Sequence, residues 1–144
     1  MARNYLVQHL SIYFIYLINF TLLLEDKMAG INKIDSSNAD IMIPDKTKVE
    51  TLEVGSTNVV RITAQPGWIW DECIKPVAGT DSCQAHHLGI IQKGQLKIMH
   101  EDGSEVFLNS GDVYEIRPGH HAEVVGDIPC SMVEFNSQAA AQMK

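Results

Sequence analysis

Short strand patterns separated by turn residues predict an all-β fold, either an antiparallel sandwich or a barrel. Apolar and polar side chains alternate with a period of two in several segments. Turn residues separate these segments at intervals of about ten residues. The chain has 144 residues, of which 45% are hydrophobic, enough for one domain with a buried core.

The alternation places eight strands along the chain. They are expected at 49–54, 59–64, 88–92, 96–101, 105–108, 113–116, 122–125 and 130–135. The apolar residues expected in or beside the core are Leu96, Ile98, Val113, Ile116 and Val124. Asp102-Gly103 predicts a hairpin with a two-residue turn, which requires a positive φ at Gly103.

The stretch G-D-V-Y-E-I-R-P-G-H-H, residues 111–121, resembles the second motif of the cupin family, written G-x5-P-x-G-x2-H. Gly111 and Gly119 match that motif, whereas its proline position holds Arg117 and its histidine position holds Ala122. In the first motif, H-x-H-x3–4-E-x6-G, counting back from Gly94 places the glutamate on His87 and the two histidines on Cys83 and Asp81.

The resemblance covers residues 49–136 and implies a double-stranded β-helix, also called a jelly-roll barrel. It also implies that ligands bind inside the barrel.

The histidines and the cysteine of these two motifs form a candidate metal site. Residues two apart in a strand share a face, so Cys83 and His87 point the same way, and the cupin register makes that face the interior. His86 points the other way, and His120 can face inward if its strand has begun. A thiolate and two imidazoles suit Zn, Fe or Ni. The alternatives are loop-end histidines without a metal and a buried, inert Cys83.

Other residues near these motifs are candidates for the pocket. Trp68 and Trp70 lie two apart and are expected on one strand face, as core packing or as the pocket wall. Residues 73–81 are expected to form a loop over the barrel mouth, where Asp81 could hydrogen-bond an imidazole. His121 and Glu115 are candidate proton handlers, and His86 replaces His87 if the register slips by one residue.

Charge and cysteine content exclude some classes of function. The net charge is −7, and no Lys/Arg cluster is present, so nucleic-acid binding is not expected. The three cysteines lack metal-ribbon or disulfide spacing, which favours a reducing, cytoplasmic location.

The N-terminal residues 1–27 contain an apolar run at 5–24 that lies outside the expected barrel. It is long enough to cross a bilayer as a helix. We interpret it as a translated upstream stretch with the real start at Met28, with a membrane anchor or a signal peptide as alternatives. Residues 28–48 read as a polar arm, in which residues 41–43 could add an edge strand, and residues 137–144 as a polar tail.

Two functions remain open from sequence. The first is a small metal-dependent enzyme, dioxygenase-like or isomerase-like, that acts on a small polar molecule. The second is a non-catalytic module that binds or senses a small molecule. The resemblance, together with exposed strand edges, also leads us to expect a homodimer.

Overall fold

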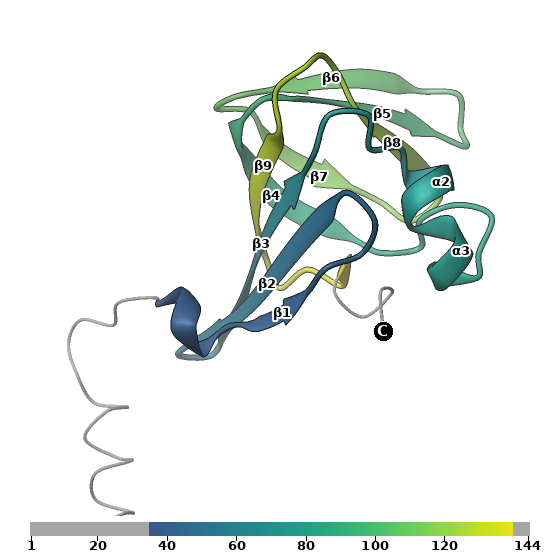
Figure 1. Ribbon diagram of the computed structural model, residues 1–144. Coiled ribbons are helices and arrows are strands. Elements are labelled where there is room, and N and C mark those ends of the chain that lie inside the picture. The colour runs from purple at the N-terminus through teal and green to yellow at the C-terminus, as the bar shows by residue number, and fades with distance from the viewer. Residues whose placement is uncertain (1–34, 140–144) are drawn as a thin grey trace, which may run out of the picture. The chain divides into compact units, whose positions relative to one another are not determined.

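The computed structural model describes residues 35–139, which form two antiparallel sheets (Figure 1). The larger sheet has six strands in the order β1-β2-β3-β9-β4-β7, and the smaller sheet has three in the order β6-β5-β8. The strands are β1 (Asp40–Met42), β2 (Thr47–Val54), β3 (Thr57–Ala64), β4 (His87–Lys93), β5 (Gln95–His100), β6 (Glu105–Asn109), β7 (Val113–Ile116), β8 (His120–Val124) and β9 (Cys130–Phe135).

The predicted all-β jelly roll is confirmed, and each of the eight expected strands is present within two residues of its expected bounds. Strands far apart in sequence become neighbours, because β9 lies between β3 and β4. A short 3-10 helix, η1 (Ser36–Asn38), precedes β1. Ile41 and Met42 lie in β1 and pair with β2, as the edge-strand interpretation anticipated.

The core lies between the two sheets and follows the alternation of the strands. Leu96, Ile98, Ile116 and Val124 are buried, as predicted. The prediction for Val113 is wrong: this side chain is 75% exposed. In β7 the inward positions are those of Tyr114 and Ile116, so the odd-numbered residues face solvent.

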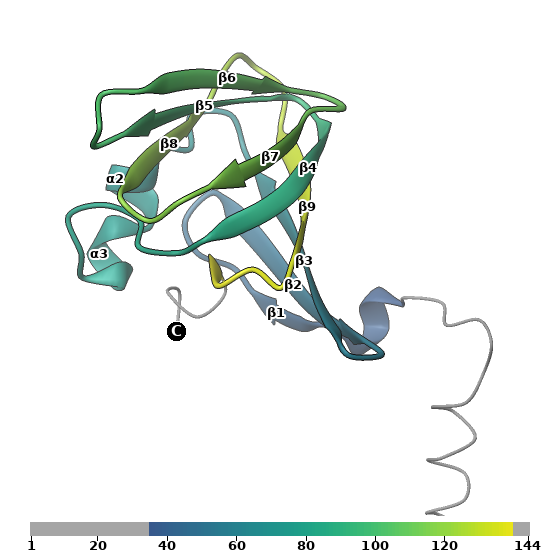
Figure 2. The ribbon, with the colours of Figure 1, turned by 180° about the vertical axis from the view of Figure 1, so that it is seen from behind.

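The segment from 73 to 81 was expected to be a loop, but part of it is helical. Two single-turn helices, α2 (Trp70–Cys73) and α3 (Lys75–Ala78), lie near one end of β8 (Figure 2). Pro76 stands in the first turn of α3, where its missing N–H costs nothing. Trp70 therefore begins a helix instead of continuing a strand, although Trp68 and Trp70 are both buried as core packing requires.

The turn between β5 and β6 contains the predicted positive φ, 89° at Gly103. The turn itself is longer than the two residues predicted. The N–H of Gly103 donates to the carbonyl of His100, and the N–H of His100 donates to the carbonyl of Ser104. This arrangement resembles the three-residue hairpin in which glycine takes the left-handed position after a type I turn.

Among residues 35–139, no helix has the length and apolar character needed to cross a membrane. The apolar run at 5–24, residues 1–27 as a whole and the last five residues of the tail lie outside the described range.

Replacing Ile98 by aspartate should lower the free energy of unfolding by about 3 kcal/mol or more, because an unpaired charge would be buried in the smaller sheet. Val106→Asp is the matched control, since that side chain is 49% exposed on the neighbouring strand β6, and it should change stability by less than about 0.5 kcal/mol. Urea unfolding of both variants measures the difference. Equal losses would contradict the burial of Ile98.

Candidate metal centre

The side chains of Cys83, His87 and His120 converge between the sheets. One potential ligand atom from each of Cys83, His87 and His120 lies within 4.8 Å of the other two. The Cys83 Sγ lies 3.5 Å from the Nε2 of His87. Cys83 is not in a regular strand but forms an isolated antiparallel bridge with His120, which brings these two residues together directly.

A buried carboxylate orients His87. The Nδ1 of His87 lies 2.9 Å and 3.0 Å from the two carboxylate oxygens of Glu134, on β9. With Nδ1–H donating to this carboxylate, the Nε2 of His87 is the atom that faces Cys83. Sequence reasoning missed Glu134.

Glu134 is only 1% exposed, and its charge is satisfied from several sides. The Tyr114 hydroxyl donates to Oε1 over 2.9 Å, and the Ser137 hydroxyl makes a short hydrogen bond to Oε2. Gly89 faces this group from β4: a Cβ there would lie 2.9 Å from both the Glu134 Cγ and the Tyr114 hydroxyl oxygen. The carbonyl oxygen of Val133, on β9, would lie closer still to such a Cβ, at 2.5 Å, so the neighbouring backbone and these two side chains together require glycine at this position.

His120 is oriented by its own turn. Its Nδ1 lies 2.7 Å from the carbonyl oxygen of Arg117, so Nδ1–H donates there and Nε2 remains available as a ligand. The rings of His87 and His120 meet edge to face, with centroids 5.0 Å apart. Both imidazoles thus leave the same nitrogen, Nε2, available for a metal ion.

Contacts within the cluster also shift the pKa values of its members. Burial opposes ionisation of the Cys83 thiol, but hydrogen bonds with His120 and His87 outweigh burial and lower the pKa of Cys83 to about 6. Burial likewise opposes protonation of His87, but Cys83 and Glu134 outweigh it and raise the pKa of His87 to about 10. Burial also opposes ionisation of Glu134. The hydrogen bond and charge of His87, with the hydroxyl groups of Ser137 and Tyr114, outweigh burial and lower the pKa of this carboxyl.

A small cavity of about 50 Å³ lies beside the three candidate ligands. Its walls are otherwise apolar or aromatic. The residues that line it are Trp68, Trp70, Ile74, Cys83, His87, His120 and Ala139.

Solved structures similar to this one share its fold at low sequence identity. One is a sugar phosphate isomerase of the cupin superfamily from Silicibacter pomeroyi. It has a TM-score of 0.51 and 16% identity, and the match covers 72% of this chain and 74% of that one. The fold of this chain is the cupin fold. Another similar structure is the Fe(II) form of HppE, with a TM-score of 0.52 and 9% identity, and the match covers 74% of this chain. A third is the polyketide cyclase RemF from Streptomyces resistomycificus, with a TM-score of 0.52 and 12% identity. The match covers 73% of this chain and 78% of that one.

This chain matches 60% of the length of HppE. No family model matches the sequence, and no curated protein matches it.

Within this cupin barrel, the other candidate residues lie outside the cavity. His86 and Glu115 lie at the surface, with the Nε2 of His86 3.0 Å from the Oε1 of Glu115. Asp81 is fully exposed and pairs with Lys75 over 3.3 Å. The Nδ1 of His121 lies 2.8 Å from the carboxylate of Asp71, and its ring meets the edge of Trp70. Of the six pocket candidates, only the two tryptophans line the cavity.

The thiol of Cys83 in metal-free protein should ionise with a midpoint near pH 6, because its pKa is lowered to about 6. Thiolate absorbance in the ultraviolet should rise as the pH increases through that midpoint. Cys83→Ser should abolish this step. Cys130→Ser should leave it unchanged, since burial raises the pKa of Cys130 to about 11. A step that survives in Cys83→Ser would contradict the assignment.

Proposed function

We propose that Cys83, His87 and His120 bind a divalent transition metal, namely Zn, Fe or Ni, and that this cupin barrel uses the metal to bind and convert a small polar molecule. The convergence of the three ligand atoms within 4.8 Å carries the proposal. The Fe(II) form of HppE and the sugar phosphate isomerase show that similar folds hold a metal or perform catalysis.

The donor set and its surroundings support this metal. One thiolate sulfur and two imidazole nitrogens are typical of Zn or another borderline transition metal, and three protein ligands leave a position for a further ligand. Each histidine donates its Nδ1–H to an acceptor, Glu134 or the Arg117 carbonyl, as metal-ligating histidines do. When bound, the metal would supply Lewis-acid chemistry at the cavity.

His87→Ala should abolish stoichiometric metal binding, because it removes one of three ligands. His86→Ala is the matched control: its side chain lies at the surface with Glu115, so metal content should be unchanged. Elemental analysis of protein purified without chelators and then reconstituted measures both. If His86→Ala loses the metal and His87→Ala keeps it, the ligand set is wrong by one residue.

Glu134→Gln should weaken metal binding by roughly 10-fold to 100-fold, because His87 loses the carboxylate that orients it. The neutral amide keeps the size of the side chain. A competition titration with a chromophoric chelator measures the affinity. An unchanged affinity would show that the carboxylate serves stability alone.

A non-catalytic binding or sensing module is the second candidate. The small volume of the cavity favours it, because about 50 Å³ leaves little space for a substrate beside a metal. Metal content below roughly 0.1 per chain, with no gain on reconstitution, would favour this alternative over any metal-dependent enzyme. We also propose that the protein is cytoplasmic, where its three buried cysteines would stay reduced, with membrane anchoring through residues 5–24 as the alternative.

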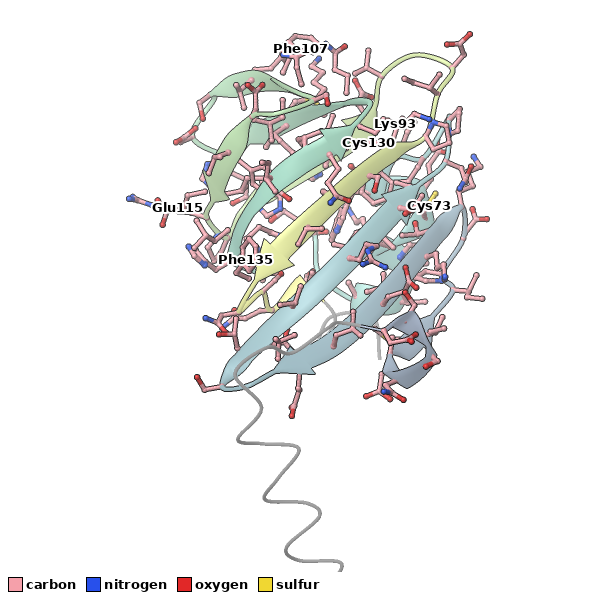
Figure 3. The ribbon with its side chains drawn as sticks, turned by 90° about the vertical axis from the view of Figure 1, so that its left-hand side faces the viewer. Cys73, Lys93, Phe107, Glu115, Cys130 and Phe135 are labelled. Atoms are coloured by element: carbon pink, nitrogen blue, oxygen red, sulfur yellow. The ribbon has the colours of Figure 1, made fainter. Side chains whose placement is uncertain are left out.

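We propose in addition that the outer face of the larger sheet mediates a homodimer. Val113, Leu88 and Phe135 are 75%, 44% and 42% exposed on the neighbouring strands β7, β4 and β9. Leu88 lies one residue beyond the Gly89–Glu134 pair, which places it beside Phe135. Figure 3 shows Phe135 at one end of β9, with Glu115 at the margin of the same view. Such a contiguous apolar face is typical of an interface.

Sedimentation should give a species of twice the chain mass of 16.0 kDa. Leu88→Lys should shift it to the monomer, because a charge would be placed in the apolar interface. Val106→Lys is the control, since Val106 is comparably exposed, at 49%, but belongs to β6 in the other sheet. A parent protein that sediments as a monomer, or a Leu88→Lys variant that stays dimeric, would contradict this interface.

A further inference from the structure

We propose that residues 137–139, which follow the last strand, form a lid over the cavity beside Cys83, His87 and His120, and that this lid opens to admit a small molecule. The inference goes beyond the proposed metal centre, because it concerns access to the cavity and holds for the metal-free protein. Ala139 is the lid residue that lines the cavity, and it is only 2% exposed.

The three candidate ligands are closed off from solvent. Cys83, His87 and His120 are buried, each with an exposed fraction of 9% or less. The cavity beside them has a volume of about 50 Å³. Pockets for small organic molecules usually have volumes of roughly 300 to 1,000 Å³. A molecule of that class therefore reaches the ligand atoms only if part of the cavity wall moves.

Most of this wall is fixed by regular structure. The wall residues other than Ala139 lie in β4, in β8, or in α2 and its C-cap, or they are held to β8 by backbone hydrogen bonds. The N–H of Cys83 donates to the carbonyl of His120 over 2.8 Å, and the carbonyl of Trp68 accepts from the N–H of Val124 over 3.0 Å. Opening the cavity at any of these places would break a sheet or a helix.

The lid is held more lightly. Among residues 35–139, its backbone makes one hydrogen bond to the barrel, from the N–H of Gln138 to the carbonyl of His86 over 3.4 Å. Its other anchor is a side chain, because the Ser137 hydroxyl donates to the carboxylate of Glu134. The N–H of Ala139 then donates to the Ser137 hydroxyl oxygen over 3.1 Å, within the lid itself. One long backbone bond and one hydroxyl group can be released without disturbing either sheet.

Asn136 is the hinge of the lid. Its φ is 50°, in the left-handed region, which asparagine adopts more readily than most residues. Its N–H donates to the carbonyl of Asn58 over 2.7 Å, and its side-chain oxygen accepts from the N–H of Asn58 over 3.2 Å. The sheet therefore ends at a fixed point. Beyond it the chain leaves β9 and turns toward the side of the barrel that carries α2 and α3 (Figure 1).

Opening of the lid leaves the candidate ligands in place. Glu134 holds both Ser137 and His87, but its hydrogen bonds with His87 and Tyr114 do not depend on the lid. The ring of His87 therefore keeps its orientation while the cavity is open. The volume of about 50 Å³ is that of the closed cavity. A lid that closes after a ligand has entered also excludes water from the site.

Alkylation of Cys83 in metal-free protein measures how readily the lid opens. The full chain and a chain that ends at Asn136 are treated with iodoacetamide at about pH 8, where Cys83 is ionised because its pKa is about 6. Mass spectrometry of the peptides gives the rate at each cysteine. Removing the lid should raise the rate at Cys83 by roughly tenfold or more. Cys73 is the internal control, because it is also 5% exposed but is not among the described residues that line the cavity. Its rate should change by less than about twofold.

A point variant tests the anchor of the lid in the full-length chain. Ser137→Ala removes the hydroxyl that ties the lid to Glu134, so alkylation of Cys83 should become several-fold faster. Gln138→Ala is the matched control, because it removes an exposed side chain and keeps the backbone N–H, and its rate should equal that of the parent.

An unchanged rate at Cys83 in the truncated chain or in Ser137→Ala would overturn the inference. Equal rises at Cys73 and Cys83 would overturn it too, because they would show that residues 137–139 are part of the core and not a lid. The metal centre is tested separately, by metal uptake of the parent protein. Failure to take up metal would contradict that centre and leave the lid standing.

Discussion

The buried carboxylate of Glu134 is the constraint on which the rest of the site depends. A charge at 1% exposure is tolerated only when it is paired and hydrogen-bonded, and removing one partner of such a pair costs about 3 to 5 kcal/mol. His87 supplies the charge, and Tyr114 and Ser137 supply hydroxyl groups. Gly89, on β4, leaves room for the Glu134 side chain, although the Val133 carbonyl oxygen would be the atom closest to a Cβ at that position. One charge thus orients the His87 ring and the hydroxyl groups of Tyr114 and Ser137.

Most of the strand framework is predictable from sequence, because alternation and turn residues are local signals. Leu96 and Ile98 are buried as their alternation requires. Val113 is the exception: its strand has four residues, and either parity would bury one β-branched residue, Val113 or Ile116. Only the pairing of His87 with Ile116 and of Ile90 with Val113 decides which face is inward. The helical turns at 70–78 were missed because their patterns are too short for a helical period to appear.

The candidate ligands could be predicted, but the groups that orient them could not. Cys83 and His87 follow from the motif register and His120 from strand parity, although Cys83 reaches the site through a bridge to His120 instead of through a strand. Glu134 is 47 residues from His87, and its role depends on β9 lying beside β4. One signal was present: Cys130, Met132 and Glu134 alternate on one face of β9, so a carboxylate falls on the inward face of an otherwise apolar strand. An inward glutamate requires a buried partner, and His87 is the nearby cation.

The same carboxylate couples the cavity to the end of the barrel. Ser137 bonds to Glu134, the N–H of Asn136 donates to the Asn58 carbonyl over 2.7 Å, and Ala139 forms part of the cavity wall. The segment after β9 therefore closes the cavity and is held by the group that orients His87. Ala139 belongs to the same network, because its N–H donates to the hydroxyl oxygen of Ser137 over 3.1 Å. Part of the cavity wall and the orientation of a candidate metal-binding histidine are thus linked through a single side chain.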